Sequence, residues 1–447
     1  MRVLLISTYE LGHQPLHVAS PAAALSGRGH EVRARDVAVE RLLPADLEWA
    51  QAVAISVPMH TAMRLGVRLA ERIKEARPEL PLCLYGLYAP LGEDLTAARA
   101  ADYVIGGEYE PALLAWAASL EGGRNPRGSV TEVSRSHFLT PRRDLLPPLD
   151  TYARLEVKGE RRLAGYVEAS HGCAHECAHC PIPVVYGGRM RLVPRPVVLE
   201  DIEQLVAAGA RHITFGDPDF MNGWRHSLLL VREVHERFPF LTFDCTVKVE
   251  HILEREELWE ELASLGCLFV VSAVELVDDV ILELLDKGHT AVDARRAVDV
   301  LRRAGIEMRP SFLPFTPWTA VSDVLEVLDF VVEKDLIGNV DPVQYSIRLL
   351  LPQGSLLLDV PEIRPHLGPY DPESLSYAWM PQHPETDDLH KELARLAEAA
   401  AAANEHPGQT FLSIYRAVSE ACGKSSGPAI EPGSLEGRPR LTEPWFC

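Results

Sequence analysis

The chain has 447 residues, enough for two or three domains, and its apolar fraction of 47% argues against disorder. The 44 Lys and Arg against 64 Asp and Glu give a formal charge of −20, which disfavours nonspecific nucleic-acid binding because that binding needs a basic surface. No apolar run is long enough to span a membrane. Eight Cys, three of them clustered, favour a reducing, cytoplasmic location.

Residues 1–122 alternate strand and helix patterns, which predicts a parallel, doubly wound sheet with its ligand site at the carboxyl ends of the strands. Strands are expected at Arg2–Ser7, Glu31–Arg35, Ala52–Val57, Leu82–Tyr85 and Tyr103–Ile105. Helices are expected at Val18–Arg28, Ala62–Ala76, Leu95–Arg99 and Glu110–Leu120. We therefore predict a Rossmann-like α/β domain over this segment.

Residues 123–160 lose the periodicity, and their Pro and Gly clusters predict a linker. A second series of strands and helices occupies residues 161–351. Its strands are expected at Ala164–Ser170, His212–Phe215, Leu241–Thr246, Leu268–Ala273, Glu307–Leu313 and Gln344–Leu350. Six strands with intervening helices predict a partial (β/α)₆ barrel, since a complete barrel of this kind needs eight.

Residues 352–447 form a C-terminal extension in which strands and helices no longer alternate. The stretch 356–385 is rich in Pro and is expected to be irregular, whereas Leu389–Ala403 and Phe411–Ala421 are expected to be helices. The segment Gly423–Arg440 is rich in Gly, Pro and Ser and is expected to be flexible. We expect the extension to shape the substrate pocket.

The most informative motif is CxxxCxxC, formed by Cys173, Cys177 and Cys180 directly after the first barrel strand. Three thiolates are one fewer than the four irons of a [4Fe–4S] cluster, so one iron stays open to another ligand. A zinc site completed by His171, His175 or His179 is the alternative, although structural zinc sites usually divide their ligands into two separated pairs. The motif thus favours a cluster with an open iron.

This motif closely resembles that of the radical SAM superfamily. There the open iron chelates the amino and carboxylate groups of S-adenosylmethionine (SAM), and an electron from the cluster releases a 5′-deoxyadenosyl radical. His179 stands where that superfamily usually has an aromatic residue. The resemblance implies an external reductant such as flavodoxin or ferredoxin.

Several polar residues at strand ends are candidate SAM contacts. Asp217 and Asp219 follow the second barrel strand, where the superfamily usually has a Gly-Gly-Glu motif that receives the SAM ammonium. A simple turn is the alternative. Glu275 ends the fourth strand, where a carboxylate can accept the ribose hydroxyls, and Lys248 follows the third strand and can pair with a carboxylate. Tyr186 is expected to cover the cluster and SAM.

The N-terminal domain resembles the cobalamin-binding domains of the same superfamily. It has the same order of strands and helices, precedes the barrel, and contains Gly106, Gly107 and Glu108, where backbone without side chains lets a flat macrocycle approach closely. The Asp-x-His-x-x-Gly motif that supplies a cobalt ligand in many carriers is absent, as it often is in cobalamin-dependent radical SAM methylases. A Rossmann-like domain without a cofactor is the alternative.

The tail from Leu441 to Cys447 resembles a radical SAM subgroup whose tail reads Cys-Cys-Ala-Glu-Pro, or has selenocysteine at the second position. We therefore expect Cys447 to reach the active site as a nucleophile or to bind a metal. The resemblance also raises the hypothesis that the natural chain continues past Cys447.

Together these resemblances imply a cobalamin-dependent radical SAM methyltransferase that acts on an unactivated carbon of a small molecule or peptide. One alternative is a radical SAM enzyme that forms C–C or C–S bonds, or rearranges its substrate, without methyl transfer. The other alternative is a zinc-stabilised binding protein. No nucleic-acid or membrane partner is expected.

Overall fold

In the computed structural model, which describes residues 1–92, 101–134, 137–424 and 437–442, the N-terminal region forms a six-stranded sheet. All pairs in it are parallel, in the order β2-β1-β3-β4-β5-β6. The strands are β1 (Arg2–Ser7), β2 (Glu31–Asp36), β3 (Ala52–Ser56), β4 (Leu82–Tyr85), β5 (Tyr103–Gly107) and β6 (Gly128–Glu132). The first five confirm the predicted strands to within two residues at each end.

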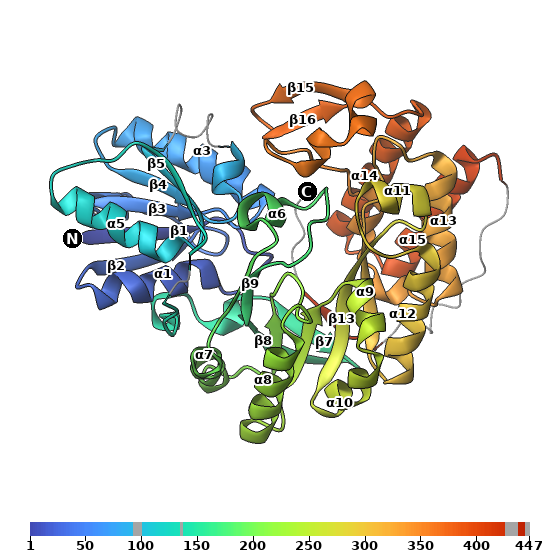
Figure 1. Cartoon of the computed structure of the whole chain (residues 1–447), viewed down its shortest axis with the longest axis horizontal. Helices are drawn as coiled ribbons and strands as arrows, with labels where there is room; N and C mark the ends of the chain where they lie inside the picture. Colours follow the sequence, from blue (N-terminus) through green and yellow to red (C-terminus); the bar gives the residue numbers. More distant parts are fainter. Residues whose placement is uncertain (93–100, 135–136, 425–436, 443–447) are drawn as a thin grey trace.

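Helices cover both faces of this sheet (Figure 1). Because successive strand residues point to opposite faces, Val3 and Leu5 pack with α1 and α5, whereas Leu4 and Ile6 pack with α3. A parallel sheet buried on both faces needs such continuous apolar runs. The helices are α1 (Leu16–Gly27), α2 (Pro44–Trp49), α3 (His60–Ala76), η1 (Ala89–Gly92) and α5 (Tyr109–Glu121). The expected helix Leu95–Arg99 lies outside the described residues.

The second sheet has seven strands in the order β14-β13-β12-β11-β8-β7-β17, and the five adjacent strands from β14 to β8 are parallel. They are β8 (Glu160–Val167), β11 (His212–Phe215), β12 (Thr242–Thr246), β13 (Cys267–Glu275) and β14 (Glu307–Phe312). Two antiparallel strands extend the edge, β7 (Arg154–Val157) and β17 (Arg440–Leu441). This sheet is the expected partial barrel, but it has five parallel strands in place of the six predicted.

Helices also follow the strands of the half-barrel (Figure 1). A short pair, β9 (Ser170–Gly172) and β10 (Met190–Leu192), flanks α6 after β8. The helices are α6 (Pro181–Tyr186), α7 (Arg195–Ala207), α8 (Trp224–Arg237), α9 (Val249–Glu254), α10 (Trp259–Ser264), α11 (Asp279–Leu284), α12 (Ala291–Arg303) and α13 (Val321–Glu333). None of the helices in the described ranges is long and apolar enough to cross a membrane.

The expected sixth barrel strand, Gln344–Leu350, does not form. Its first residues belong to the 3₁₀ helix η6 (Pro342–Ser346), and one bridge between Phe315 and Arg348 is the only pairing in the described part of this stretch. The side-chain oxygen of Gln344 accepts from the backbone N–H of Phe312 at 3.0 Å. A side chain therefore takes the place of a ladder hydrogen bond at the end of β14.

The segments on either side of the barrel are more structured than the sequence predicted. The expected linker contributes β6 and β7, and the stretch expected to be irregular contains the hairpin of β15 (Leu367–Asp371) and β16 (Ser376–Trp379). The turn of this hairpin reaches the N-terminal domain, where Nε2 of His60 lies 2.6 Å from the carbonyl of Ser374. The remaining elements are η2 (Arg143–Leu145), η3 (Leu149–Thr151), η4 (Glu256–Leu258), η5 (Ile337–Asn339), η7 (Leu356–Asp359), η8 (Pro361–His366), α14 (Glu385–Ala403) and α15 (Pro407–Ala421).

One buried cation ties the connecting segment to both domains. Arg143 donates two hydrogen bonds, of 2.9 and 2.8 Å, to the carboxylate of Asp201 on α7. It also donates to the carbonyls of Tyr166 on β8 at 2.7 Å and Gln14 in the N-terminal domain at 3.2 Å. The Arg143 and Asp201 side chains are 6% and 4% exposed, so each depends on the other for charge compensation.

Replacing Arg143 by Met should therefore leave a buried carboxylate without its cation. We expect the free energy of unfolding, measured by urea denaturation, to fall by about 3–5 kcal/mol. The matched control is Arg142→Met, because Arg142 pairs with Asp144 in an exposed salt bridge. This substitution should lower the free energy of unfolding by less than about 1 kcal/mol. Equal losses in the two variants would contradict this account.

Candidate functional site

The three cysteines lie on one loop that is fixed at both ends. The loop leaves β9 at Gly172, whose φ is +71°, and an added Cβ there would meet the carbonyl oxygen of Arg189 at 2.3 Å. It ends at Cys180, which occupies the N-cap position of α6, and Pro181 takes the first helical position, which favours proline. Cys173 and Cys177 are buried and Cys180 is half-buried, and all three are free thiols.

Hydrogen-bond donors and burial define the environment of these thiols. The Cys173 sulfur accepts from Nδ2 of Asn222 at 3.2 Å and from the backbone N–H of His175 at 3.5 Å. Burial raises the pKa of Cys173, and it raises that of Cys180 to about 12.

A buried cation lies beside the thiols. Nζ of Lys287 is 3.0 Å from the carboxylate of Glu275, and Nε2 of His179 lies 3.1 Å from the same oxygen. Burial opposes the charge on Glu275, but Lys287 and His179 outweigh it and hold the pKa of Glu275 below its usual range. Burial likewise opposes the charge on Lys287, whose pKa is nevertheless raised by Glu275 and by Cys177.

Lys287 was missed by the sequence analysis. Its loop packs against the cysteine loop, because the backbone N–H of Ala178 donates to the carbonyl of Leu285 at 2.9 Å. A lysine between a helix and a turn gives no local signal of such a contact. Glu275, which was predicted to bind the ribose of SAM, has φ of +64° and already holds two cationic partners.

The two acids predicted to receive the SAM ammonium organise the backbone around the site. Asp217 is 2% exposed and accepts from the backbone N–H of Ala169 at 2.9 Å and the hydroxyl of Ser170 at 2.5 Å. Burial raises the pKa of Asp217 to about 7. A direct contact of Asp217 with SAM stays a prediction.

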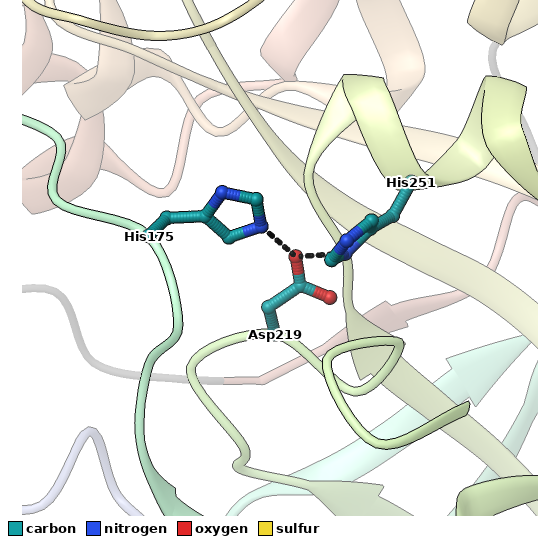
Figure 2. Close-up of side chains that lie close together, drawn as sticks. All are labelled: His175, Asp219 and His251. Carbon is teal, nitrogen blue, oxygen red and sulfur yellow. Dashed lines mark hydrogen bonds and ion pairs between the residues drawn. The ribbon is translucent and has the colours of Figure 1, made fainter. Parts of the chain in front are cut away.

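Asp219 lies between two histidines (Figure 2). Its carboxylate accepts from the backbone N–H of Met221 at 2.9 Å and is 2.8 Å from Nδ1 of His251. The backbone N–H of Lys248 donates to it at 3.3 Å, while the Lys248 ammonium is 3.2 Å from Glu250. Lys248 therefore has the carboxylate partner that the sequence predicted, and its contact with SAM stays a prediction.

Half-buried imidazoles and largely buried carboxylates connect the N-terminal domain to the barrel. Glu108, at the end of β5, lies 3.1 Å from Nδ1 of His171 and accepts from the Tyr186 hydroxyl at 3.0 Å. The other ring nitrogen of His171 is 3.2 Å from Glu168, whose second oxygen is 3.3 Å from Nε2 of His17 on α1. We call these five side chains the interdomain network. Tyr186 and Glu108 thus contact each other at the domain boundary.

The charges of the interdomain network stabilise one another. Burial opposes the charge on His171, but Glu108 and Glu168 raise its pKa well above the usual value. Burial also opposes the charge on His17, whose pKa is nevertheless raised to about 9 by Glu168 and Glu10. The pKa of Glu168 is held low by the two histidines despite its burial. The network therefore joins the domains by ion pairs.

The glycines before Glu108 are required by the packing of the N-terminal sheet. A Cβ on Gly106 would meet the Pro90 ring at 2.7 Å. Gly107 has φ of +72°, and a Cβ on it would lie 2.1 Å from the carbonyl oxygen of Glu132. Their role beside a macrocycle stays a prediction. Cys447 lies outside the described residues, so its predicted role and the tail hypothesis also stay predictions.

Two family models match the chain. The radical SAM superfamily matches residues 167–331, which contain the three cysteines, and the B12 binding domain matches residues 2–117. An uncharacterised methyltransferase from Synechocystis sp. is 27% identical over 296 residues, covering 63% of this chain and 52% of the relative. The chain thus spans about half the length of the first curated relatives it matches.

Solved structures show the same fold. The radical S-adenosylmethionine methyltransferase TsrM from Kitasatospora setae superposes with a TM-score of 0.64 at 19% identity, covering 81% of this chain and 76% of that one. The cobalamin-dependent S-adenosylmethionine radical enzyme OxsB gives 0.66 at 15% identity, covering 90% of this chain and 66% of that one. These likenesses confirm the expected α/β fold.

The interdomain network makes stability depend on pH. The pKa of His17 is about 9 in the folded protein and about 6.5 in the unfolded chain, so its contribution is complete below pH 6.5 and is lost as the pH rises through 9. Over this window the unfolding free energy of the wild type should fall by up to about 3 kcal/mol more than that of His17→Gln. The exposed His383→Gln serves as control and should follow the wild type. Parallel curves for wild type and His17→Gln would contradict the prediction.

Proposed function

Because the chain belongs to the radical SAM superfamily and carries a B12-binding domain, we propose that it is a cobalamin-dependent methyltransferase acting on an unactivated carbon. The observation that carries the proposal is the junction of the two domains. Glu108, at the carboxyl end of β5, contacts His171 and Tyr186, which lie on either side of the three cysteines in the sequence. The strand ends of one domain therefore meet the cysteine loop of the other.

Membership of these families implies a [4Fe–4S] cluster, SAM and cobalamin. When bound, the cluster supplies the electron that cleaves SAM, and cobalamin supplies the methyl group for transfer. Cys173, Cys177 and Cys180 would hold the cluster, since they are free thiols on one loop and leave one of the four irons without a protein ligand. Two buried polar atoms without partners, Oδ1 of Asn222 and Nδ1 of His179, offer contacts for the polar groups of SAM.

The residues of the chain position the reactants and exclude water. Asp217 and Asp219 fix the loops around the cysteines through backbone hydrogen bonds, and Lys287 supplies a positive charge beside the thiolates. Asp217, Asp219, Glu275 and Lys248 remain candidates for direct SAM contact in the loaded enzyme. Tyr186 closes the boundary between the domains by its hydroxyl contact with Glu108.

The substrate is proposed to enter where three parts of the chain meet. A cavity of about 160 Å³ is lined there by the N-terminal domain, α6 and the C-terminal extension. Its lining residues are Pro90, Leu91, Thr131, Val184, Val185, Gln353 and Gly354. This setting suits a small molecule or a peptide side chain, and the net charge of −20 argues against a nucleic acid. An external reductant and a cytoplasmic location complete the proposal.

The proposal is tested on anaerobically reconstituted protein. We expect one [4Fe–4S] cluster and one cobalamin per chain, and release of 5′-deoxyadenosine from SAM under reducing conditions. The variant with all three motif cysteines changed to Ala should retain cobalamin and release none. A product heavier by one CH₂ unit, found in extract of the native host, would identify methyl transfer. Protein that turns over substrate without bound cobalamin would refute the proposal.

The charges beside the thiols should set the potential of the cluster. Because a nearby positive charge favours the reduced cluster, Lys287→Met should lower the midpoint potential and Glu275→Gln should raise it. A redox titration followed by EPR measures both. The exposed Lys391→Met serves as control and should leave the potential unchanged. Shifts of the same sign in the Lys287 and Glu275 variants would contradict the electrostatic explanation.

A further inference from the structure

Three metal-ligating side chains converge beside the cysteine loop without forming part of the CxxxCxxC motif. His175 comes from that loop, Asp219 from the loop after β11 and His251 from α9, which follows β12. Nδ1 of His251 lies 2.8 Å from Oδ2 of Asp219, and Nε2 of His175 lies 4.0 Å from the same oxygen (Figure 2). One ligand atom from each of the three lies within 4.8 Å of the others.

The carboxylate at the centre of this group needs a counter-charge. Its side chain is fully buried, and a buried carboxylate is costly without a cation or a metal. Among the described residues, imidazoles alone lie within salt-bridge distance of Asp219. The nearby ammonium of Lys248 pairs with Glu250 instead, and it is the backbone N–H of Lys248 that reaches Asp219.

His175 adds a second, independent observation. Its Nε2 atom is buried and has no hydrogen-bond partner, although it points at the Asp219 carboxylate (Figure 2). Its other ring nitrogen lies 3.8 Å from the carboxylate of Glu250. A histidine that offers one nitrogen to a metal commonly has a carboxylate near the other, because that contact fixes the ring orientation and the tautomer.

We propose that His175, Asp219 and His251 bind one divalent late transition-metal ion, such as Zn²⁺, Fe²⁺ or Co²⁺. Two imidazole nitrogens and one carboxylate oxygen are the ligands that these ions prefer, and three protein ligands leave a coordination position open. Metal–ligand bonds of about 2.0–2.2 Å place ligand atoms roughly 3–4 Å apart, so small movements of the rings suffice. In the metal-free protein the hydrogen bond between His251 and Asp219 occupies this place.

The site lies at the carboxyl ends of the barrel strands, beside the proposed reaction centre. Its open position would take a water, carboxylate or amine, and the ion would act there as a Lewis acid. This proposal does not depend on methyl transfer. It does compete with the prediction that Asp219 receives the SAM ammonium, because one carboxylate cannot serve both cations at once.

The test uses reconstituted protein with its cluster in the oxidised state, which gives no EPR signal. We expect added Co²⁺ to bind with a stoichiometry of one per chain and to give a high-spin Co²⁺ spectrum of nitrogen and oxygen ligation. Asp219→Asn and His251→Gln should each weaken binding at least tenfold. His383→Gln, which changes an exposed histidine, should bind as the wild type does. Cluster absorbance and circular dichroism report whether each variant is folded.

Three outcomes would overturn the proposal. The first is the absence of protein-bound Co²⁺ at stoichiometric addition. The second is undiminished binding in folded His251→Gln, which is the milder of the two substitutions because His251 is partly exposed. The third is a sulfur-to-cobalt charge-transfer band, which would assign the ion to the motif cysteines. Because the readout is metal binding, failure here leaves the methyltransferase proposal untouched.

Discussion

His171 lies between two buried carboxylates, Glu108 from the N-terminal domain and Glu168 from the barrel, two residues before the first motif cysteine. Each of these groups would be costly to bury alone, and together they compensate one another. The position of the cysteine loop relative to the N-terminal strand ends therefore depends on this contact. A reaction that needs two cofactors across a domain boundary depends on the same geometry.

Buried ion pairs also position other parts of the site. Arg143 with Asp201 ties the connecting segment to the barrel, and Lys287 with Glu275 holds a positive charge beside the thiols. Buried ion pairs contribute less to net stability than equivalent apolar packing, but breaking one is costly, so they define one arrangement of the parts. Apolar packing forms the core of each domain, and these ion pairs fix how the two domains contact each other.

Local patterns in the sequence predicted most of the fold. The alternation of strands and helices predicted the parallel, doubly wound N-terminal sheet. The CxxxCxxC spacing predicted a cluster on one loop, and that prediction stays untested. The strand predicted at Gln344–Leu350 was wrong because the alternation of polar and apolar residues there is compatible with a strand. The hydrogen bond between Gln344 and Phe312, which takes the place of a strand pairing, cannot be read from the sequence. Strand β6 was missed because its short, polar run lies among Gly and Pro.

In the candidate site, too, the sequence predicted where some residues lie but not which partners they contact. An acid after a parallel strand, such as Asp219, predicts a position near the reaction centre, but the sequence does not say which donors it meets. Its partner His251 is 32 residues away, and Lys287 is 12 residues from Glu275. Such pairs depend on how the strands are ordered in the barrel, so periodicity and motif spacing do not reveal them.

The most direct test of the account is the magnetic interaction between the two bound cofactors. Holoprotein is prepared with cobalamin in its paramagnetic Co(II) state, and its EPR spectrum is recorded before and after one-electron reduction of the cluster. If the N-terminal strand ends meet the cysteine loop as described, reduction of the cluster should broaden or split the cobalt signal. A cobalt spectrum that is unchanged by cluster reduction would contradict the account.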